Sequence, residues 1–356
     1  MELIRPDINV NFVAFRYKAF LISGFFILLG LAAFVWRGGL NLGVDFAGGT
    51  LIQVKFNKAT NPEEIRGALK DLISQGAIQQ VGASSDQEYL IRTDLNTPEL
   101  QNLSQTVEEK LTAAYGEGNA TVLRAEMVGP KVGHDLRQKA LYAIYYAVLF
   151  ISIYISGRFE FKWGISAVMV AVLIVGVYLL EALGINVTAV IIGALLVTLI
   201  LCWVLKLPYA MGSLLSLIHD VLITAGIFIL LDKEFTLEVL AALLTLIGFS
   251  LNDTIVVFDR IRETLRKGRN QNFHDVINAS VNQTLSRTIL TSGTVVMVVL
   301  CLFLFGGTVI HDFSFALLIG LISGTYSTIF VASPILIFFE DFHKKRPVRK
   351  RASSSS

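Results

Sequence analysis

Charged residues are scarce in this chain: only 16% of its 356 residues are Asp, Glu, Lys or Arg, whereas 54% are hydrophobic. A soluble domain of ordinary composition is about a quarter charged, so the composition argues against a water-soluble globular enzyme. Cysteine is nearly absent, and Cys202 and Cys301 both lie in apolar runs, which excludes a disulfide framework and a multi-cysteine metal site. The net charge of +2 gives no general argument for nucleic-acid binding.

What the chain has instead is a series of long apolar runs. A membrane-spanning helix needs about 20 mostly apolar residues, and the first run, residues 19–36, contains no charged residue. A signal peptide has a similar pattern, but this run is long for a signal and no clear cleavage site follows it, so we favour an uncleaved helix. Seven further runs predict seven more spans: Ala140–Ile155, Gly164–Leu183, Thr188–Leu205, Ala210–Leu231, Leu237–Phe258, Ile289–Phe305 and Phe313–Phe339. At Gly184–Asn186 a single re-entrant hairpin is the alternative to two spans.

Lysine and arginine are unevenly distributed among the short loops. With residues 1–18 in the cytoplasm, the short loops on the opposite side carry only Lys233. The positive-inside rule therefore places both ends of the chain in the cytoplasm and residues 37–139 outside it. The basic tail, residues 340–356, is expected to contact anionic lipid headgroups. The residues that fall on the cytoplasmic side are Arg5, Arg16, Lys18, Arg158, Lys162, Lys206, the cluster from Arg260 to Arg269, and the tail.

Residues 37–139 have the mixed composition of a soluble domain. The pattern predicts strands at Thr50–Phe56, Ile78–Gly82, Glu88–Arg92 and Thr121–Val128, with helices that begin at Asn61–Glu64 and Thr97–Glu99. The order β-α-β-β-α-β is that of a ferredoxin-like fold, which hosts too many functions to indicate one. The predicted fold class is therefore an α-helical polytopic membrane protein with one small α+β domain outside the cytoplasm.

Ionisable side chains inside apolar runs are costly and are functional candidates by default. Asp253 is the strongest, because its short side chain lies at least five largely apolar residues from the basic cluster. His219 and Asp220 lie in the middle of another run, where hydrogen bonding between helices is an equally good explanation. Arg287 enters the next run and has the alternative of extending to the headgroups. Asp259, at the end of its run and beside Arg260, fits an interfacial surface pair with that arginine.

The surroundings of Asp253 favour a proton relay. Ser250 and Asn252 flank it and are candidate accessory residues, together with His219 and Asp220. If the helix that carries Arg287 begins near Ala279, Arg287 lies at a similar depth on the neighbouring antiparallel span. We therefore expect an ion pair that keeps Asp253 charged, and a proton that neutralises Asp253 would free Arg287 for another partner.

Five short segments combine glycine, polar or ionisable residues in fixed patterns. They are GVDFAGGT at Gly43–Thr50, VGPKVG at Val128–Gly133, LIHDV at Leu217–Val221, GFSLNDTIVVFDRIRE at Gly248–Glu263 and LSRTILTS at Leu285–Ser292. In this order, over nearly the whole chain, they resemble segments of the SecF family of bacterial protein-export subunits. The fourth segment alone is specific, and all five argue against a chance match. The first two supply the candidate structural residues Asp45, Gly48, Gly49, Gly129 and Pro130.

The resemblance implies a function and its partners. SecF pairs with SecD, and together they resemble resistance-nodulation-division transporters with two pseudo-symmetric six-helix halves. The pair associates with the SecYEG channel in the bacterial cytoplasmic (inner) membrane and uses the proton-motive force to complete export of unfolded preproteins. No enzymatic activity, cofactor, metal or nucleic acid is implied; the coupling ion is the proton. The family's proton-pathway aspartate and arginine match Asp253 and Arg287.

The chain departs from the family in one place. The family usually has six spans, and residues 164–205 are predicted to be an inserted helical hairpin at the periphery of the bundle. Two competing functions are a small-molecule or lipid exporter of the same superfamily and a membrane scaffold without ion flux. An exporter usually carries two halves and two large extracytoplasmic domains in one chain, and a scaffold does not need Asp253 and Arg287 in adjacent spans.

Overall fold

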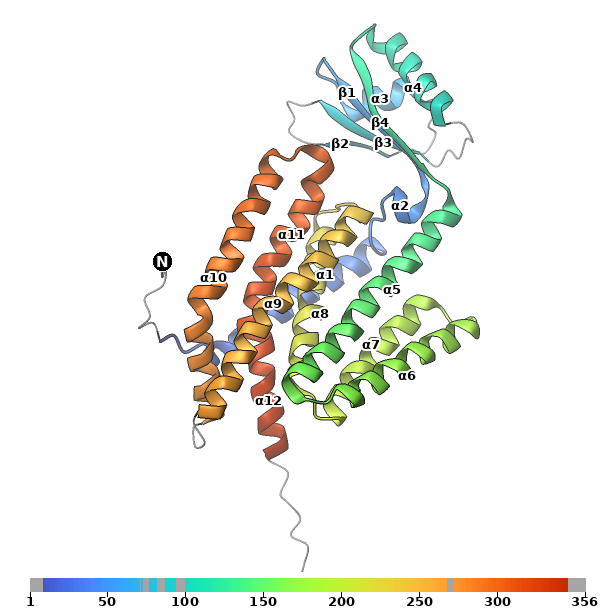
Figure 1. Cartoon of the computed structure of the whole chain (residues 1–356). Helices are drawn as coiled ribbons and strands as arrows, with labels where there is room; N and C mark the ends of the chain where they lie inside the picture. The colour runs from blue at the N-terminus through green and yellow to red at the C-terminus, as the bar shows by residue number, and fades with distance from the viewer. Residues whose placement is uncertain are drawn as a thin grey trace, which may run out of the picture.

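The structure is a computed structural model, and it describes residues 9–70, 72, 77–81, 87–93, 100–267 and 272–344. Residues 1–8 and 345–356 of the two predicted cytoplasmic ends lie outside the described residues, as do Gly82, Thr97–Glu99 and Arg269. Figure 1 shows a bundle of long helices with a small sheet domain at one end. The domain is formed by a segment of the chain between the first and second long helices, α1 (Arg16–Arg37) and α5 (Pro130–Ile155).

The sheet domain has the strand and helix order that its sequence predicts. Its elements are β1 (Gly49–Phe56), α3 (Pro62–Ala68), β2 (Ala77–Val81), β3 (Glu88–Thr93), α4 (Leu100–Tyr115) and β4 (Ala120–Val128). The strands lie in the order β2-β3-β1-β4, and every neighbouring pair is antiparallel. Side chains alternate along β1, so that Ile52 and Val54 pack with Val107 and Leu111 of α4 in the domain core. The other face of the sheet is turned toward the bundle (Figure 1).

Helix α3 begins where its sequence indicates. The side chain of Asn61 accepts a hydrogen bond from the backbone N–H of Glu64 at 2.9 Å and donates one to the Glu64 carboxylate at 2.8 Å. Pro62 occupies the first helical position, where its missing N–H costs nothing. Ile65 of α3 is fully buried against the sheet, so this local capping also fixes part of the domain core.

Eight helical segments among the described residues are long and apolar enough to cross a membrane. This agrees with the eight spans that the sequence predicts. Besides α1 and α5, they are built from α6 (Trp163–Ala182), α7 (Val187–Val204), α8 (Pro208–Leu230), α9 (Leu237–Lys267), α10 (Phe273–Phe305), and the continuous segment of α11 (Gly307–Ser327), η3 (Thr328–Ala332) and α12 (Ser333–Lys344). Two five-residue π-helical turns interrupt the α-helical pattern, at Ser156–Glu160 after α5 and at Thr328–Ala332.

Helices α9 and α10 are longer than the apolar runs that predict them. The run in α9 ends at Phe258 but the helix continues to Lys267, and α10 begins at Phe273 rather than near Ile289. Charged pairs at helical spacing support the extension of α9, since Glu263 is bonded to both Arg260 and Lys267. The apolar run marks the membrane-compatible part of a helix and not its ends.

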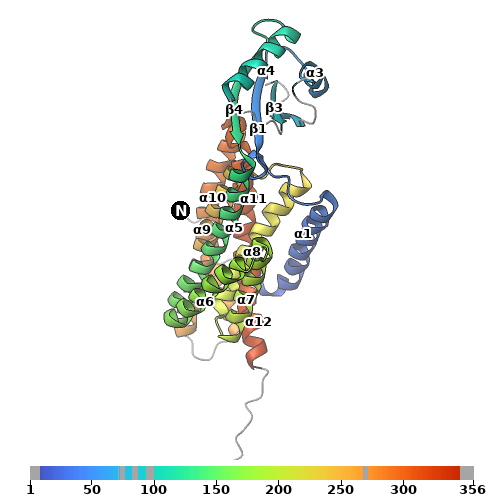
Figure 2. The same ribbon diagram turned by 90° about the vertical axis from the view of Figure 1, so that its right-hand side faces the viewer.

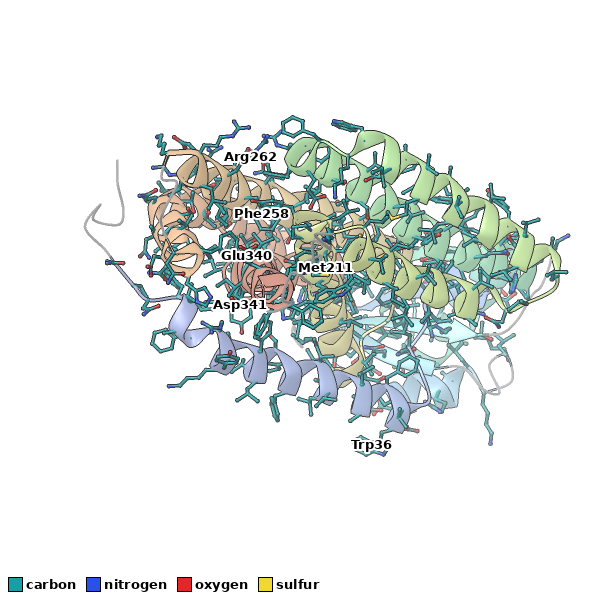
Figure 3. The ribbon with its side chains drawn as sticks, turned by 90° about the horizontal axis from the view of Figure 1, so that it is seen from below. Trp36, Met211, Phe258, Arg262, Glu340 and Asp341 are labelled. Carbon is teal, nitrogen blue, oxygen red and sulfur yellow. The ribbon has the colours of Figure 1, made fainter. Side chains whose placement is uncertain are left out.

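Helices α6 and α7 pack beside α5, on the side of the bundle away from α10 (Figure 1). At the domain end of the hairpin, the Glu181 carboxylate accepts hydrogen bonds from Gln138 at 2.6 Å and from Tyr142, both on α5. At the opposite end, Lys162 donates to the carbonyl of Leu205 at 2.8 Å. Seen from below in Figure 3, α1 and this hairpin lie along different edges of the bundle.

Helix α1 makes an unusually close contact with α8. A Cβ atom added to Gly30 would lie 2.8 Å from the Cα atom of Gly226, so the two backbones touch at this point. Small residues allow such close helix approach in membranes. Figure 2 shows α1 beside α8. Toward its N-terminal end α1 also contacts the last span, where Tyr17 and Phe20 pack against Phe338. The glycine pair is therefore the closest of several contacts that hold α1 on the bundle.

The sheet domain is tied to the bundle at several points. The backbone N–H of Gly43 donates to the carbonyl of Phe235 at 2.9 Å, and the N–H of Phe235 donates to the carbonyl of Asn41 at 2.7 Å. Arg92 of β3 forms an ion pair with Glu234, next to this backbone contact. The loop between α8 and α9 is therefore a docking point for the sheet domain.

Candidate functional site

Asp253 is buried at the contact between α9 and α10. Only 3% of its surface is exposed, although it lies within a candidate membrane span. The buried face of α9 is otherwise formed by apolar and small side chains, among them Leu246, Ser250 and Val257. Helical spacing places Asp253 on this face rather than toward the outside of the bundle. The sequence therefore correctly singles out a carboxylate that the fold buries.

Two hydroxyl groups of α10 hold the Asp253 carboxylate. Ser292 Oγ donates to Oδ2 at 2.6 Å, the short distance that is typical of a bond to a charged acceptor. Thr291 Oγ1 lies 3.4 Å from Oδ1, but it is closer to the backbone carbonyl oxygens of Arg287 and Thr288, at 2.9 and 3.1 Å. A hydroxyl has one proton to donate, so Ser292 is the principal donor to Asp253.

The donors to Asp253 belong to a polar stripe on α10 that the sequence reasoning missed. Thr284, Thr288 and Ser292 are all buried and recur every fourth residue, so they form one face of the helix. Within the described part of the chain, the buried hydroxyl of Thr288 has no hydrogen-bond partner. Buried polar atoms are nearly always bonded, so this hydroxyl, one turn from Ser292, is available to donate a hydrogen bond. The recurrence of small hydroxyl residues in an otherwise apolar run was the signal for this face.

The predicted ion pair between Asp253 and Arg287 is not formed. Arg287 is exposed, and within the residues described here no hydrogen bond or ion pair joins it to Asp253. The reason is its position on α10: Thr288 and Ser292 face α9, whereas Arg287 lies about 100° around the helix from Thr288. Arg287 is one turn before Thr291, at the edge of the polar stripe, and its side chain is directed to the surface of the bundle.

The four candidate accessory residues separate into two groups. His219, Asp220 and Ser250 come together in a second buried cluster, in which Ser250 Oγ donates to Asp220 at 2.7 Å and not to Asp253. Asn252 is exposed on the outer face of α9 and does not join either cluster. Asp259 is a surface pair, but its partner is Arg158, at 2.6 Å, and not the predicted Arg260, which pairs with Glu263.

The candidate structural residues lie where the chain passes between the domain and the bundle. Asp45 is in the short helix α2 (Val44–Ala47), which the sequence did not predict, and its carboxylate accepts from the N–H of Leu237 at 3.0 Å, at the start of α9. Gly48 and Gly49 both have positive φ angles, and a Cβ on Gly48 would lie 2.9 Å from the Cα of Pro130. This is the tight backbone path that the two glycines predict. Gly129 caps α5, and Pro130 occupies its first turn.

A cleft of about 1020 Å³ separates the open face of the sheet from the domain end of the bundle. Six carboxylates line it, with two basic side chains: Asp45, Glu88, Glu126, Glu234, Glu238 and Asp312, with Arg124 and Lys233. Burial raises the pKa of Asp45 above its ordinary value, an effect that the N–H of Leu237 opposes. Burial also raises the pKa of Glu234 and outweighs the opposing charge of Arg92. Ion pairs offset four of the six carboxylates, which are Glu88 with Lys55, Glu126 with Arg124, Glu234 with Arg92 and Asp312 with Lys233. The cleft is therefore rich in carboxylates, most of which have a basic partner.

No group of three His, Cys, Asp or Glu residues within the described ranges is arranged to hold a metal ion. The Asp253 site has one carboxylate and hydroxyl donors, a set that can bind and release a proton.

Comparison with known proteins identifies the family of this chain. The family model of the SecD/SecF GG motif matches residues 37–60, and that of the C-terminal part of the protein export membrane proteins SecD and SecF matches residues 106–200 and 185–341. The protein translocase subunit SecF of Calditerrivibrio nitroreducens is 39% identical over 97% of this chain and 99% of its own length. The SecF of Desulfurispirillum indicum is 40% identical, over 93% and 91% respectively. The chain belongs to the SecF family.

Solved SecDF structures share the fold of this SecF-family chain. The crystal structure of SecDF from Thermus thermophilus, a translocon-associated membrane protein, superposes with a TM-score of 0.69 at 29% identity. It covers 95% of this chain, which spans only 40% of the length of that SecDF chain. A SecDF structure in a super-membrane-facing form gives a TM-score of 0.55 at the same identity. The resemblance to SecF that the five sequence segments carry is confirmed, and the chain is a protein translocase subunit with several membrane-compatible helices.

Proposed function

We propose that this chain is the SecF subunit of a SecD–SecF complex and couples the proton-motive force to late steps of preprotein translocation through the SecYEG channel. The observation that carries the proposal is the buried Asp253 carboxylate, which is held by hydroxyl groups and is bonded to no basic side chain among the residues that the structure describes. The proposal is supported by the curated SecF relatives and by the likeness to SecDF, whose printed description is a translocon-associated membrane protein. The chain acts as an auxiliary subunit and not as an enzyme, and the proton is its coupling ion.

In the proposed proton pathway Asp253 binds the proton and Arg287 pairs with a group outside this chain. A proton that reaches Asp253 removes its charge and weakens the bond from Ser292, which is strong only to a charged acceptor. Arg287 is already turned to the surface of the bundle, so its counter-charge comes from outside this chain. We propose that an acidic side chain of SecD supplies it, and that the proton at Asp253 changes how the two subunits pack.

The face that carries Arg287 and Asn252 is the proposed contact with SecD. Both side chains are exposed within candidate membrane spans, on the neighbouring helices α10 and α9. Polar and charged side chains at membrane depth generally face another protein surface and not lipid. A second six-helix half that covers this face would bury both groups.

The proposed orientation places the sheet domain, residues 37–139, outside the cytoplasm of a bacterial inner membrane. Arg158, Lys162, Lys206 and Arg262 all lie at the opposite end of the bundle, which the positive-inside rule assigns to the cytoplasm. Arg262 of α9 donates to the backbone carbonyl of Arg158, in the π-helical turn after α5, at 3.0 Å, so these two basic residues lie together. The strand order of the domain supports a ferredoxin-like assignment. In this orientation the carboxylate-rich cleft faces the side from which protons enter.

The remaining partners follow from the same proposal. The bilayer covers the exposed apolar faces of the bundle, including those of the hairpin α6–α7, which we propose to be peripheral to the proton pathway. An unfolded preprotein that leaves the SecYEG channel meets the complex on the side of the sheet domain. Neither a metal, nor an organic cofactor, nor nucleic acid has a part in this function.

The test is export in membrane vesicles with an imposed proton gradient. Asp253→Asn keeps the shape of the side chain and removes its charge, so it should abolish the stimulation of export by the gradient while the complex with SecD still forms. Asp259→Asn, six residues along the same helix, is the matched control, because Asp259 is an exposed surface pair with Arg158. Wild-type stimulation in Asp253→Asn vesicles would show that Asp253 is structural and would refute the relay.

A further inference from the structure

A second carboxylate, Asp220, is buried in the bundle away from Asp253. It lies on α8, and 1% of its surface is exposed. Ser323 Oγ of α11 donates to Oδ1 at 2.7 Å. Ser250 Oγ of α9 and Ser327 Oγ of α11 donate to Oδ2 at 2.7 and 2.9 Å. Three helices therefore meet at one carboxylate, and each of its oxygens is already bonded to a hydroxyl group.

The neighbouring residue, His219, connects this carboxylate to α1. Its Nδ1 atom lies 3.0 Å from Asp220 Oδ1, and its Nε2 atom lies 3.0 Å from Ser23 Oγ. The imidazole ring stacks on the ring of Tyr326, with 5.9 Å between the centroids. Only 6% of the His219 surface is exposed, so the imidazole takes its hydrogen-bond partners from the protein.

Ser23 has one proton and two possible acceptors. The hydroxyl of Tyr326 donates to the carbonyl of Ala19 at 2.8 Å, because a carbonyl only accepts. Ser23 Oγ lies 3.2 Å from the Tyr326 oxygen and 3.0 Å from His219 Nε2. When Ser23 donates to Tyr326, Nε2 carries a hydrogen and donates to Ser23; when Ser23 donates to Nε2, that nitrogen carries none.

The same contacts fit the pair with and without one additional proton. Without it, Nδ1 carries the hydrogen of a neutral imidazole and donates to the ionised Asp220, and Ser23 donates to Nε2. With it, Nδ1–H still donates to Asp220, Nε2–H donates to Ser23, and Ser23 donates to Tyr326. The additional proton gives the buried carboxylate of Asp220 a counter-charge at 3.0 Å.

We propose that His219 and Asp220 form a second proton-binding site, separate from Asp253, that transmits its charge state to α1 through Ser23. With the proton bound, the pair is neutral as a whole and every hydrogen bond is satisfied. When the proton leaves Nε2, Nδ1 keeps its hydrogen bond to Asp220 and the Ser23 hydroxyl turns from Tyr326 to Nε2, so the hydrogen bonds that join α1 to α8 and α11 change. The link to export rests on the proposed function, whereas the proton binding itself does not.

Few other titratable groups face this pair. Tyr326 of α11 stacks on the imidazole, and Asp253 lies three residues from Ser250 on α9. Helix α1 presents the hydroxyl of Ser23, and α11 also presents the hydroxyls of Ser323 and Ser327. Of these groups Asp253 is the one whose charge changes in the proposed relay, so the two sites influence each other through α9.

The deciding experiment counts the protons at the site in the complex with SecD, reconstituted in lipid nanodiscs. ¹⁵N NMR of labelled histidine reports whether each ring nitrogen carries a hydrogen, and infrared spectra report a protonated carboxyl group. Both are recorded between about pH 5 and 8, the range in which histidine ordinarily titrates. His219→Gln, which cannot titrate, and Asp220→Asn assign the two signals.

We expect the additional proton of the His219–Asp220 pair to be present at the lower pH and absent at the higher pH. Two results would overturn the proposal. One is a His219 with a single ring hydrogen beside an ionised Asp220 over the whole pH range. The other is an additional proton that is retained over the whole pH range, because the pair would then be purely structural. In export assays, His219→Gln and Asp220→Asn should flatten the pH dependence of the stimulation. Thr254→Val is the matched control, because it removes a buried hydroxyl bond to Thr328 without a titratable partner. If the wild-type complex shows no stimulation by a gradient, the proposed function fails and the spectra still decide this site.

Discussion

Asp220 and Asp253, two buried carboxylates of the bundle, differ in how completely they are hydrogen-bonded. Asp220 accepts bonds from three serines at 2.7 to 2.9 Å and lies 3.0 Å from His219. Asp253 has one short bond, from Ser292, and a second hydroxyl at 3.4 Å that is closer to other acceptors. Its expected counter-charge, Arg287, is directed away from it. The first carboxylate is enclosed by its own chain, whereas the second is only partly satisfied.

This difference indicates two kinds of site. A buried carboxylate with a complete set of donors and a counter-charge is costly to disturb, because every partner loses a bond together. A carboxylate with one strong donor can change its protonation with a smaller rearrangement. Asp253 therefore suits exchange with a partner subunit, and the cluster of Asp220 suits the storage of a proton inside this subunit.

The largest effect on stability is expected for Asp220→Ala. The substitution leaves a protonatable His219 and three serine hydroxyls without their acceptor, and breaking a buried pair costs about 3–5 kcal/mol. Asp253→Ala removes an acceptor from two hydroxyls and should cost about 1–3 kcal/mol. Reversible unfolding in bicelles measures both. Equal losses for the two variants would show that the two sites are not held differently.

A loss smaller than that of Asp220→Ala, and similar to that of Asp253→Ala, is expected for Ser292→Ala. It removes the 2.6 Å bond to Asp253, and a hydrogen bond to a charged group is worth about 1.5–3 kcal/mol. Thr291→Val, which removes only the 3.4 Å contact and two bonds to backbone carbonyls, is the control. The same unfolding measurement ranks the two variants. If Thr291→Val is the more damaging, the assignment of Ser292 as principal donor is wrong.

Substitution of Arg287 should separate function from stability. Because Arg287 is exposed in this chain, Arg287→Ala is expected to change the free energy of unfolding by less than about 0.5 kcal/mol in the absence of SecD. Gradient-driven export should nevertheless be lost, whereas Arg287→Lys keeps the charge and should retain part of it. The comparison needs both assays on the same preparations. A large loss of stability without SecD would indicate that Arg287 has a partner within this chain.

The smallest effect is expected outside the membrane, for Asp45→Asn. Burial raises the pKa of Asp45 in the folded state above its unfolded value of 3.8, so the folded state binds the proton more tightly. The stabilisation from this group is therefore complete at low pH and is lost as pH rises through the folded-state pKa. The asparagine variant should lose this part of the pH dependence and keep the bond from Leu237. Thermal unfolding across acidic pH tests it, and an unchanged slope would contradict the expectation.

The sequence predicts the parts of this structure that depend on local patterns. Apolar runs give the eight spans, alternation gives the four strands, and burial of Asp253 follows from its short side chain in a long apolar run. The partners of the carboxylates were not predictable in this way. Ser250, Ser323 and Ser327 are distant in sequence, and only helix packing brings them to Asp220. Arg287 was paired with Asp253 by depth alone, but the rotation of α10 about its axis decides which side chain faces α9.

The contact between Gly30 and Gly226 leaves no room for a side chain between α1 and α8. Ser23 lies seven residues before Gly30 on the same helix, about 10 Å away at 1.5 Å per residue. A Cβ atom added at Gly30 would have to push α1 away from the backbone of α8, and Ser23 with it away from His219. A residue that carries no chemistry of its own therefore keeps the hydroxyl group at its distance from the imidazole.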